Sequence, residues 1–325
     1  MDTPVVKDIN NVAVIGAGLM GKAIAYVFSS KYRVAVYDIK PIDINNDIRK
    51  IVQELVDNGV LSEDELEQRL SKISMVTLMD HEAIACADIV VESVFEDMEL
   101  KKNTFAQLEK ICCDDCIFCT NTSVMSPTEI SMDIQHRDRF TATHFWNPAH
   151  LIPLVEVVMS DATSFQTAQT MMSILASVGK KPILCKKDAP GFIGNRLQFA
   201  LWREAFYMVE EGIADPKTID EACKYGPGLR WPVLGPMENS DLIGLDLTYN
   251  MHNYLLKWLD DSHEPSPLIK EMLESGENGM KTGKGWQTWT PEEVERVNTR
   301  LRKHLITFKV PDESIVREEQ ILCQK

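Results

Sequence analysis

The residues best suited to moving a proton are His144 and Glu156, which lie twelve positions apart (156 − 144) in HFWNPAHLIPLVEVV. Pro148 and Pro153 can turn the chain between them, so that two strands run side by side and the carboxylate meets the imidazole. A carboxylate in that position orients the ring. Such a pair is typical of a general base that takes the proton of an alcohol. The alternative is a structural histidine near a strand end.

A glycine-rich segment, GAGLMG, has the spacing of a loop that binds a dinucleotide. It stands between a β-branched run, residues 12–15, and a stretch with helical periodicity. The first glycine permits a tight turn, the second lets the backbone approach a pyrophosphate, and the third lets helix pack on strand. The pyrophosphate would lie on free amide groups at the start of the helix. The expected contacts are Gly16, Gly18, Leu19, Met20 and Gly21.

An acidic residue, Asp38, ends the next β-branched run, residues 33–38. Its carboxylate can accept hydrogen bonds from the ribose hydroxyls of adenosine, and its charge would repel the extra phosphate of NADP. Lys40 lies two residues away and softens that preference. NAD is therefore the expected cofactor, with a structural or tolerant role for Asp38 as the alternative.

Two polar residues are suited to holding a substrate oxygen. Ser123 closes the strand-end sequence NTS, and Asn195 lies in the first turns of the helix that follows PGF. Ligands of open α/β sheets bind at the carboxyl ends of the strands. We expect these two groups to contact a substrate hydroxyl or the nicotinamide amide. A turn serine and a helix cap are the alternative.

Strand and helix patterns alternate through the first part of the chain, which predicts the elements that must position these residues. Residues 43–73 have the pattern of a helical pair broken at Asn58-Gly59, and SEDELEQRL provides a serine cap with a glutamate three positions later. The alternation predicts an α/β fold, a Rossmann-type doubly wound parallel sheet with an inserted helical pair. Strands are expected at 12–15, 33–38, 87–93, 116–123, 139–145 and 153–159.

The character of the chain changes after residue 188, because β-branched runs stop and helical periodicity takes over. An apolar stripe begins at Phe192 and ends at Gly212. We therefore predict an NAD-binding domain over residues 1–188 and an all-α C-terminal domain over residues 189–325.

Composition limits the classes of partner. The chain has 325 residues with 34 Lys and Arg against 49 Asp and Glu, a net charge of −15 that repels phosphate backbones. No run of 18 apolar residues appears, and the first ten residues carry acids rather than a basic region before an apolar one. We expect a soluble, cytoplasmic protein that binds neither nucleic acid nor membrane.

Half of the eight cysteines crowd into ICCDDCIFCT. The spacing of Cys113, Cys116 and Cys119 is compatible with a metal or iron–sulfur site, but no Cys-Pro follows at the ferredoxin spacing and no histidine lies nearby. We expect reduced structural thiols and no metal.

Several motifs occur in one order along the chain and together resemble the L-3-hydroxyacyl-CoA dehydrogenase family over about residues 10–290. They are GAGLMG with Asp38, VVESVFEDMELKK, NTS, HFWNP with PLVEVV, PGFIGNR, GPMENSDLIGLD and KTGKGW. The resemblance implies NAD-dependent oxidation of an L-3-hydroxy group to the 3-oxo compound, as in fatty acid metabolism. It also implies a C-terminal helical domain that forms a homodimer.

The resemblance also implies roles for single residues. His144 looks like the catalytic base, Glu156 like its carboxylate partner, and Asn195 and Ser123 like the groups that hold the substrate oxygen. The family's NAD contacts fall on Asp38, Glu96, Lys101, Asn147 and Lys281.

Two segments depart from the family pattern. Acyl-CoA members carry lysines along the helical pair, whereas RKIVQELVDNGVLSED keeps Lys50 but adds acids, and carboxylates facing phosphates cost affinity. The segment KYGPGLRWPVLGPM is similar to carnitine dehydrogenases and to gulonate dehydrogenases that also serve as lambda-crystallin. Its Arg230 is suited to a substrate carboxylate, or to a surface or dimer interface. The expected substrate is a 3-hydroxyacyl-CoA such as 3-hydroxybutyryl-CoA. A free 3-hydroxy acid and a non-catalytic crystallin-like binding protein are the alternatives.

Overall fold

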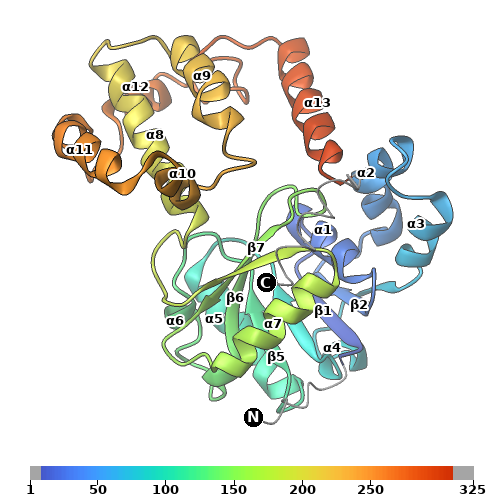
Figure 1. Ribbon diagram of the computed structural model, residues 1–325. Helices are drawn as coiled ribbons and strands as arrows, with labels where there is room; N and C mark the ends of the chain where they lie inside the picture. The colour runs from blue at the N-terminus through green and yellow to red at the C-terminus, as the bar shows by residue number, and fades with distance from the viewer. Residues whose placement is uncertain (1–8, 310–325) are drawn as a thin grey trace. The chain divides into compact units, whose positions relative to one another are not determined.

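The computed structural model describes residues 9–309, which divide into two compact units (Figure 1). The first unit holds the described residues up to Asn195 together with those from Leu301, and the second is Arg196–Arg300. This division falls after Asn195, and the last described residues group with the first unit. The boundary expected at residue 188 follows a change of periodicity along the chain, whereas this division follows which residues pack together.

The first unit is built on one eight-stranded sheet with the order β3-β2-β1-β4-β5-β6-β7-β8. Neighbouring strands are parallel except for β6 and β7, which are antiparallel. The predicted Rossmann-type sheet is confirmed, with this one antiparallel pair added. The strands are β1 (Asn11–Ile15), β2 (Arg33–Tyr37), β3 (Ile73–Val76), β4 (Ile89–Glu92), β5 (Ile117–Thr120), β6 (Phe140–Phe145), β7 (Leu154–Met159) and β8 (Lys181–Cys185).

Helices cover both faces of this sheet. One buried cluster joins β1, β2 and β7 to α1, α2, α3 and α7, and includes Ile306 from the last turn of α13. A second cluster lies on the other face, beneath α4, α5 and α6. The helices of this unit are α1 (Leu19–Phe28), α2 (Ile44–Asp57), α3 (Glu63–Leu70), α4 (Glu82–Ala85), α5 (Met98–Ile111), α6 (Pro127–Ile130), η1 (Arg137–Arg139) and α7 (Phe165–Ser177).

The inserted helical pair is confirmed as α2 and α3, which lie side by side in Figure 1. Helix α2 ends at Asp57, just before the predicted break, and Ser62 forms the predicted capping box with Glu65 at the start of α3. Two strands were not predicted. β3 has only four residues and an exposed Ser74, and β8 contains Pro182, which is tolerated because β8 is an edge strand.

The second unit is helical. Its elements, with the helices that connect it to the first unit, are α8 (Gly194–Glu210), α9 (Pro216–Tyr225), η2 (Pro227–Leu229), α10 (Pro236–Ile243), α11 (Leu245–Leu255), η3 (Leu256–Trp258), α12 (Pro267–Glu274) and α13 (Pro291–Thr307). The apolar stripe predicted after Phe192 lies on α8. No residue between 196 and 300 is buried, so large apolar side chains such as Val233, 80% exposed, and Leu242, 70% exposed, face outward.

The cysteines are free thiols throughout the described chain, and Cys323 lies outside it. Cys112, Cys116 and Cys119 are buried, and burial raises the pKa of Cys119 to about 12. Between residues 9 and 309, no group of three or more His, Cys, Asp or Glu side chains is placed to hold a metal ion. In the same range no helix is both long and apolar enough to span a bilayer.

Candidate active site

The register of β6 against β7 brings His144 opposite Glu156. The two strands are antiparallel neighbours, so directly opposed residues point to the same face of the sheet. His144 Nδ1 lies 2.8 Å from Glu156 Oε2, and the two residues are 4% and 0% exposed. The structure thus places an imidazole and a carboxylate in direct, buried contact.

Glu156 receives four hydrogen bonds. Oε2 accepts one from His144 and one from Trp146 Nε1 at 3.2 Å, and Oε1 accepts the backbone N–H groups of Ile193 and Gly194, each at 2.9 Å. Burial alone would raise the pKa of Glu156, but these hydrogen bonds outweigh it and lower the pKa. The carboxylate therefore stays ionised, which keeps the proton of His144 on Nδ1 and leaves Nε2 as an acceptor.

Aromatic rings enclose the imidazole. The centroids of Trp146 and Phe192 each lie 5.7 Å from that of His144. Gly194 must be glycine, because a Cβ there would collide with the Trp146 ring. Within residues 9–309, no side chain or backbone group forms a hydrogen bond to Nε2 of His144. The nitrogen that a base would use is therefore free of protein partners in that range.

Ser123 and Asn195 are brought together next to this pair. Asn195 Nδ2 donates to the backbone oxygen of Ser123 at 2.9 Å. The carboxyl ends of β5 and β6 are tied by Asn121 Oδ1, which accepts the backbone N–H of Phe145 at 2.9 Å. Because β5 and β6 are parallel neighbours, Ser123, which follows β5, and His144, near the carboxyl end of β6, lie at the same edge of the sheet.

The glycine loop fits a phosphate group. Gly16 has a φ of 102°, donates its N–H to Tyr37 O at 2.8 Å, and could not carry a Cβ, which would lie 2.6 Å from Ser93 O. A Cβ on Gly18 would meet nothing within 4 Å, so this side of the loop is open. Helix α1 begins at Leu19 with no side chain capping its amide groups. Those free donors are what a pyrophosphate needs.

Asp38 supports this loop directly. Its Oδ2 accepts the backbone N–H of Ala17 at 2.8 Å, and its Oδ1 accepts that of Lys40 at 3.1 Å. The side chain remains partly exposed at the end of β2. Asp38 therefore has a structural role and still leaves lone pairs for ribose hydroxyls.

Lys101 belongs to a buried network and not to an open surface. It is 1% exposed, and its Nζ lies 2.8 Å from Glu92 Oε1 and 3.2 Å from Glu96 Oε2. Glu96 also accepts hydrogen bonds from the Thr122 hydroxyl and from the Ser123 N–H. Burial would raise the pKa of Glu96, but Thr122, Lys101 and Ser123 together lower it. The network therefore links the start of α5 to the Ser123 loop through Glu96.

Four other predicted residues are exposed, whereas Gly21 is buried in α1. Asn147 lies in the β6–β7 connection, and Lys50 on α2 is 3.9 Å from Asp47. Lys281 and Arg230 are exposed residues of the second unit, and neither forms an ion pair with any described side chain.

Sequence reasoning missed several residues of the site. Two of them could have been found from the sequence. Glu92 is an acid at the end of a hydrophobic strand, and Trp146 lies two residues after His144 in HFWNP. Phe192 and the backbone N–H of Gly194 give no such signal, because their contact with Glu156 and His144 depends on how PGFIGN folds back onto β7.

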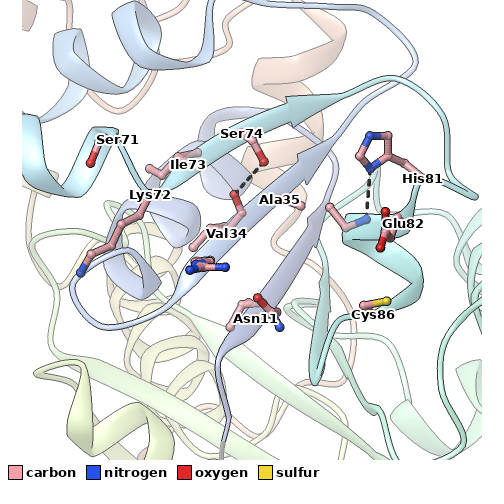
Figure 2. A pocket seen from close by; sticks show the side chains of 13 residues that line it. Asn11, Val34, Ala35, Ser71, Lys72, Ile73, Ser74, His81, Glu82 and Cys86 are labelled. Carbon is pink, nitrogen blue, oxygen red and sulfur yellow. Dashed lines mark hydrogen bonds between the residues drawn. The ribbon is translucent and has the colours of Figure 1, made fainter.

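A separate cleft lies at the amino-terminal ends of β1, β2 and β3, away from the edge that carries His144 (Figure 2). It has a volume of about 510 Å³ and is lined by polar groups that include Asn11, Ser74, His81 and Cys86. None of the predicted site residues lines it.

Comparison with known proteins agrees with the fold. The chain is 30% identical over 304 residues to a 5-formyl-3-hydroxy-2-methylpyridine 4-carboxylate 5-dehydrogenase of Mesorhizobium japonicum, covering 93% of this chain and 97% of that protein. It is 34% identical over 284 residues to a probable 3-hydroxybutyryl-CoA dehydrogenase of Bacillus subtilis, covering 86% and 97%. A crystal structure described as a 5-dehydrogenase of the same pyridine carboxylic acid, an NAD⁺-dependent dismutase, superposes with a TM-score of 0.84 at 28% identity, covering 93% and 97%.

The family assignment covers nearly the whole described chain. Residues 11–189 match the profile of the 3-hydroxyacyl-CoA dehydrogenase NAD-binding domain, and residues 191–289 match that of the C-terminal domain of the same family. These matches confirm the resemblance, the fold class and NAD as the cofactor. The chain therefore belongs to the 3-hydroxyacyl-CoA dehydrogenase family of NAD-dependent oxidoreductases.

Proposed function

We propose that the protein oxidises the 3-hydroxy group of an L-3-hydroxyacyl-CoA, such as 3-hydroxybutyryl-CoA, to the 3-oxo compound. The observation that carries this proposal is the buried contact of 2.8 Å between His144 Nδ1 and Glu156 Oε2, with Nε2 left as the acceptor. The family assignment supplies NAD as the oxidant.

In this mechanism His144 is the general base and Glu156 its partner. Nε2 accepts the proton of the 3-hydroxyl, and the ionised Glu156 stabilises the imidazolium that forms. When bound, NAD would supply the acceptor for the hydride on the same carbon, so that the alcohol would become a ketone and one proton would be left on the base. Ser123 and Asn195, which contact each other, hold the substrate oxygen during the transfer.

The cofactor would be held by the carboxyl edge of the sheet and by α1. Open Gly18 and the uncapped amides of α1 would bind the pyrophosphate. Glu96 would contact the cofactor, and buried Lys101, which pairs with Glu96, would hold that carboxylate in place. The other proposed contacts are Gly16, Leu19, Met20, Gly21, Asp38, Asn147 and Lys281.

Replacing Asp38 by alanine is expected to weaken NADH binding by about 10- to 100-fold, because hydrogen bonds to a charged group contribute roughly 1.5–3 kcal/mol. The variant also loses the charge that disfavours the phosphate of NADPH, so the ratio of NADPH to NADH affinity rises. Fluorescence titration of both cofactors measures this, with Lys31→Ala, at an exposed lysine between α1 and β2, as the control. An unchanged affinity for NADH would reduce Asp38 to its structural contact with Ala17.

A second candidate is oxidation of a free hydroxy acid. Lys50 on α2, the lysine that the family pattern keeps for the CoA phosphates, and Lys22 on α1 both lie against Asp47, at 3.9 and 3.3 Å. The Mesorhizobium relative, whose name specifies a pyridine carboxylate, aligns over 93% of the chain. Exposed Arg230 would then pair with the substrate carboxylate.

A substrate panel tests both candidates. Initial rates of NADH formation are measured with 3-hydroxybutyryl-CoA, with free 3-hydroxybutyrate, and with carnitine, gulonate and pyridine carboxylate alcohols. Turnover of the thioester alone supports the first candidate, and turnover of free acids that Arg230→Met abolishes supports the second. NAD binding without turnover of any member would favour a crystallin-like binding protein.

We also assign the NAD-binding role to residues 1–188 and the dimerisation and substrate role to residues 189–325. The absence of any buried residue between 196 and 300 supports a homodimer, because a helical unit with its large apolar side chains outward requires another surface to cover them. We place the protein in the cytoplasm and in fatty acid metabolism, without a nucleic-acid partner.

The double variant Val233→Asp with Leu242→Asp is expected to convert the homodimer to monomer, because charges on a covered apolar surface are costly to bury. Analytical ultracentrifugation at micromolar protein gives the mass. Leu78→Asp is the matched control, since Leu78 is 64% exposed in the first unit. A dimer that persists in the double variant would place the interface elsewhere.

A further inference from the structure

Lys180 is a buried lysine that the proposed mechanism does not use. It lies immediately before β8 and is 6% exposed. Its Nζ donates hydrogen bonds to the backbone oxygens of Ala149 and Ile152, the latter at 2.8 Å, and lies 5.9 Å from the centroid of the Phe145 ring. Within the described chain no carboxylate forms an ion pair with it. Its polar partners are therefore two carbonyl groups of one segment.

That segment, residues 146–153, connects the strand of His144 to the strand of Glu156. It turns tightly, since the N–H groups of Leu151 and Ile152 both donate to Pro148 O at 3.0 Å. Phe145, the ring nearest to the Lys180 ammonium, is the residue after His144. Lys180 thus contacts both the end of β6 and the connection to β7.

A second link ties Lys180 to the same strand pair. Lys180 is followed by β8, which pairs in parallel with β7 so that Ile183 lies beside Glu156. The backbone of the lysine donates to Leu175 O at 3.0 Å, at the end of α7. The paired strands β7 and β8 therefore hold Lys180 in place, and its ammonium in turn holds the 146–153 connection.

Burial at this position raises the free energy of the charged form of Lys180. Burial, and next the charge of Lys309, lower the pKa of Lys180 to about 7. His150 in the same connection is buried, and burial with the charges of Lys180 and Lys309 lowers its pKa to about 4. Glu54 Oε1 lies 3.6 Å from His150 Nε2 and is the carboxylate nearest to it, and Arg302 pairs with the other oxygen of Glu54 at 3.4 Å. An apolar side chain would fill the space of Lys180 without this cost but would leave the two carbonyls unpaired.

We propose that Lys180 is a positioning residue for the His144–Glu156 pair. Its ammonium fixes the 146–153 connection on β8 and so sets the separation and orientation in which the imidazole meets the carboxylate. The proposal rests on the proposed function, because the position of the His144–Glu156 pair affects catalysis only if His144 is the general base. A misplacement of about 1 Å at a reacting group can cost about 100-fold in rate.

The test is Lys180→Met, which keeps most of the length of the side chain but removes its donors. The expected result is a fall in kcat of about 10- to 100-fold with NAD affinity unchanged. The proton between His144 Nδ1 and Glu156 Oε2 should give a low-field resonance in the proton NMR spectrum, identified by its absence in His144→Ala. In Lys180→Met this resonance is expected to shift or broaden. The matched control is Lys186→Met, an exposed lysine just beyond β8.

The outcomes separate the alternatives. A native resonance with a native kcat in Lys180→Met would overturn the proposal. A lower kcat with a lower melting temperature would also overturn it if the resonance stays in place, because the variant would then lose activity through general destabilisation. If Lys180→Met does not fold, Lys180→Gln, which can still donate to one carbonyl, is expected to give the same shift at smaller size. The resonance is read without substrate, so it decides the positioning role even if no panel member is turned over and the proposed function fails.

Discussion

Alanine at position 144 is expected to lower kcat by about 10²- to 10⁴-fold, the range that a positioned general base contributes. The reason is that Nε2 is the only imidazole nitrogen available, since Nδ1 is committed to Glu156. NAD affinity should stay nearly unchanged, because the proposed pyrophosphate and ribose sites lie on the glycine loop and Asp38.

The His144→Ala measurement combines initial rates with the best substrate of the panel and a fluorescence titration of NADH. His263→Ala, at an exposed position of the second unit, shows what loss of a surface histidine does. Turnover equal to that of this control would remove His144 from the mechanism and leave the cofactor site as the remaining functional assignment.

The second large effect is expected from Glu156→Gln. The carboxylate accepts His144 and Trp146 on one oxygen and two backbone N–H groups on the other. An amide has one oxygen and one NH₂ group, so one pair of donors must face another donor. We expect a fall in kcat of about 10²- to 10⁴-fold, because the imidazole loses the partner that fixes its tautomer and stabilises its charged form.

Glu156→Gln should reduce turnover far more than NAD binding. Unpaired buried donors cost roughly 1–3 kcal/mol each, so a lower melting temperature is expected as well. Thermal unfolding, NADH titration and kcat are measured on the same preparations, with Glu99→Gln on the exposed first turn of α5 as the control. A variant that folds and keeps native kcat would show that the carboxylate is only structural.

The elements that the sequence predicted well are those whose signals are local. The alternation of short β-branched runs with helical periodicity is complete within a window of about ten residues, and Ser62 with Glu65 forms its capping box from residues three apart. The strands β3 and β8 were not predicted because their sequence patterns are weak. β3 has four residues with Ser74 exposed, and β8 begins with a Lys-Pro pair, so only pairing to a neighbouring strand makes either a strand.

The candidate site was predictable in part for the same reason. The spacing of His144 and Glu156, together with the two prolines between them, predicts that the two side chains meet, and the structure places them in contact. Lys101 shows the limit of this approach, because its motif position implies a cofactor contact while its side chain is buried between Glu92 and Glu96. Whether a lysine reaches solvent depends on what covers it, and the covering residues are distant in sequence.

The sequence by itself determined that this chain folds around a dinucleotide-binding sheet and carries an imidazole and a carboxylate that could serve an alcohol. Those properties follow from residue types and from periodicity, which are local. The tertiary structure alone decided that β7 runs antiparallel to β6 and so sets Glu156 opposite His144. It also decided that backbone groups of Ile193 and Gly194, far along the chain, complete the shell of that carboxylate. Hydrogen bonds of this kind form only when distant chain segments pack together. Residue type does not predict which backbone amide will contact the carboxylate.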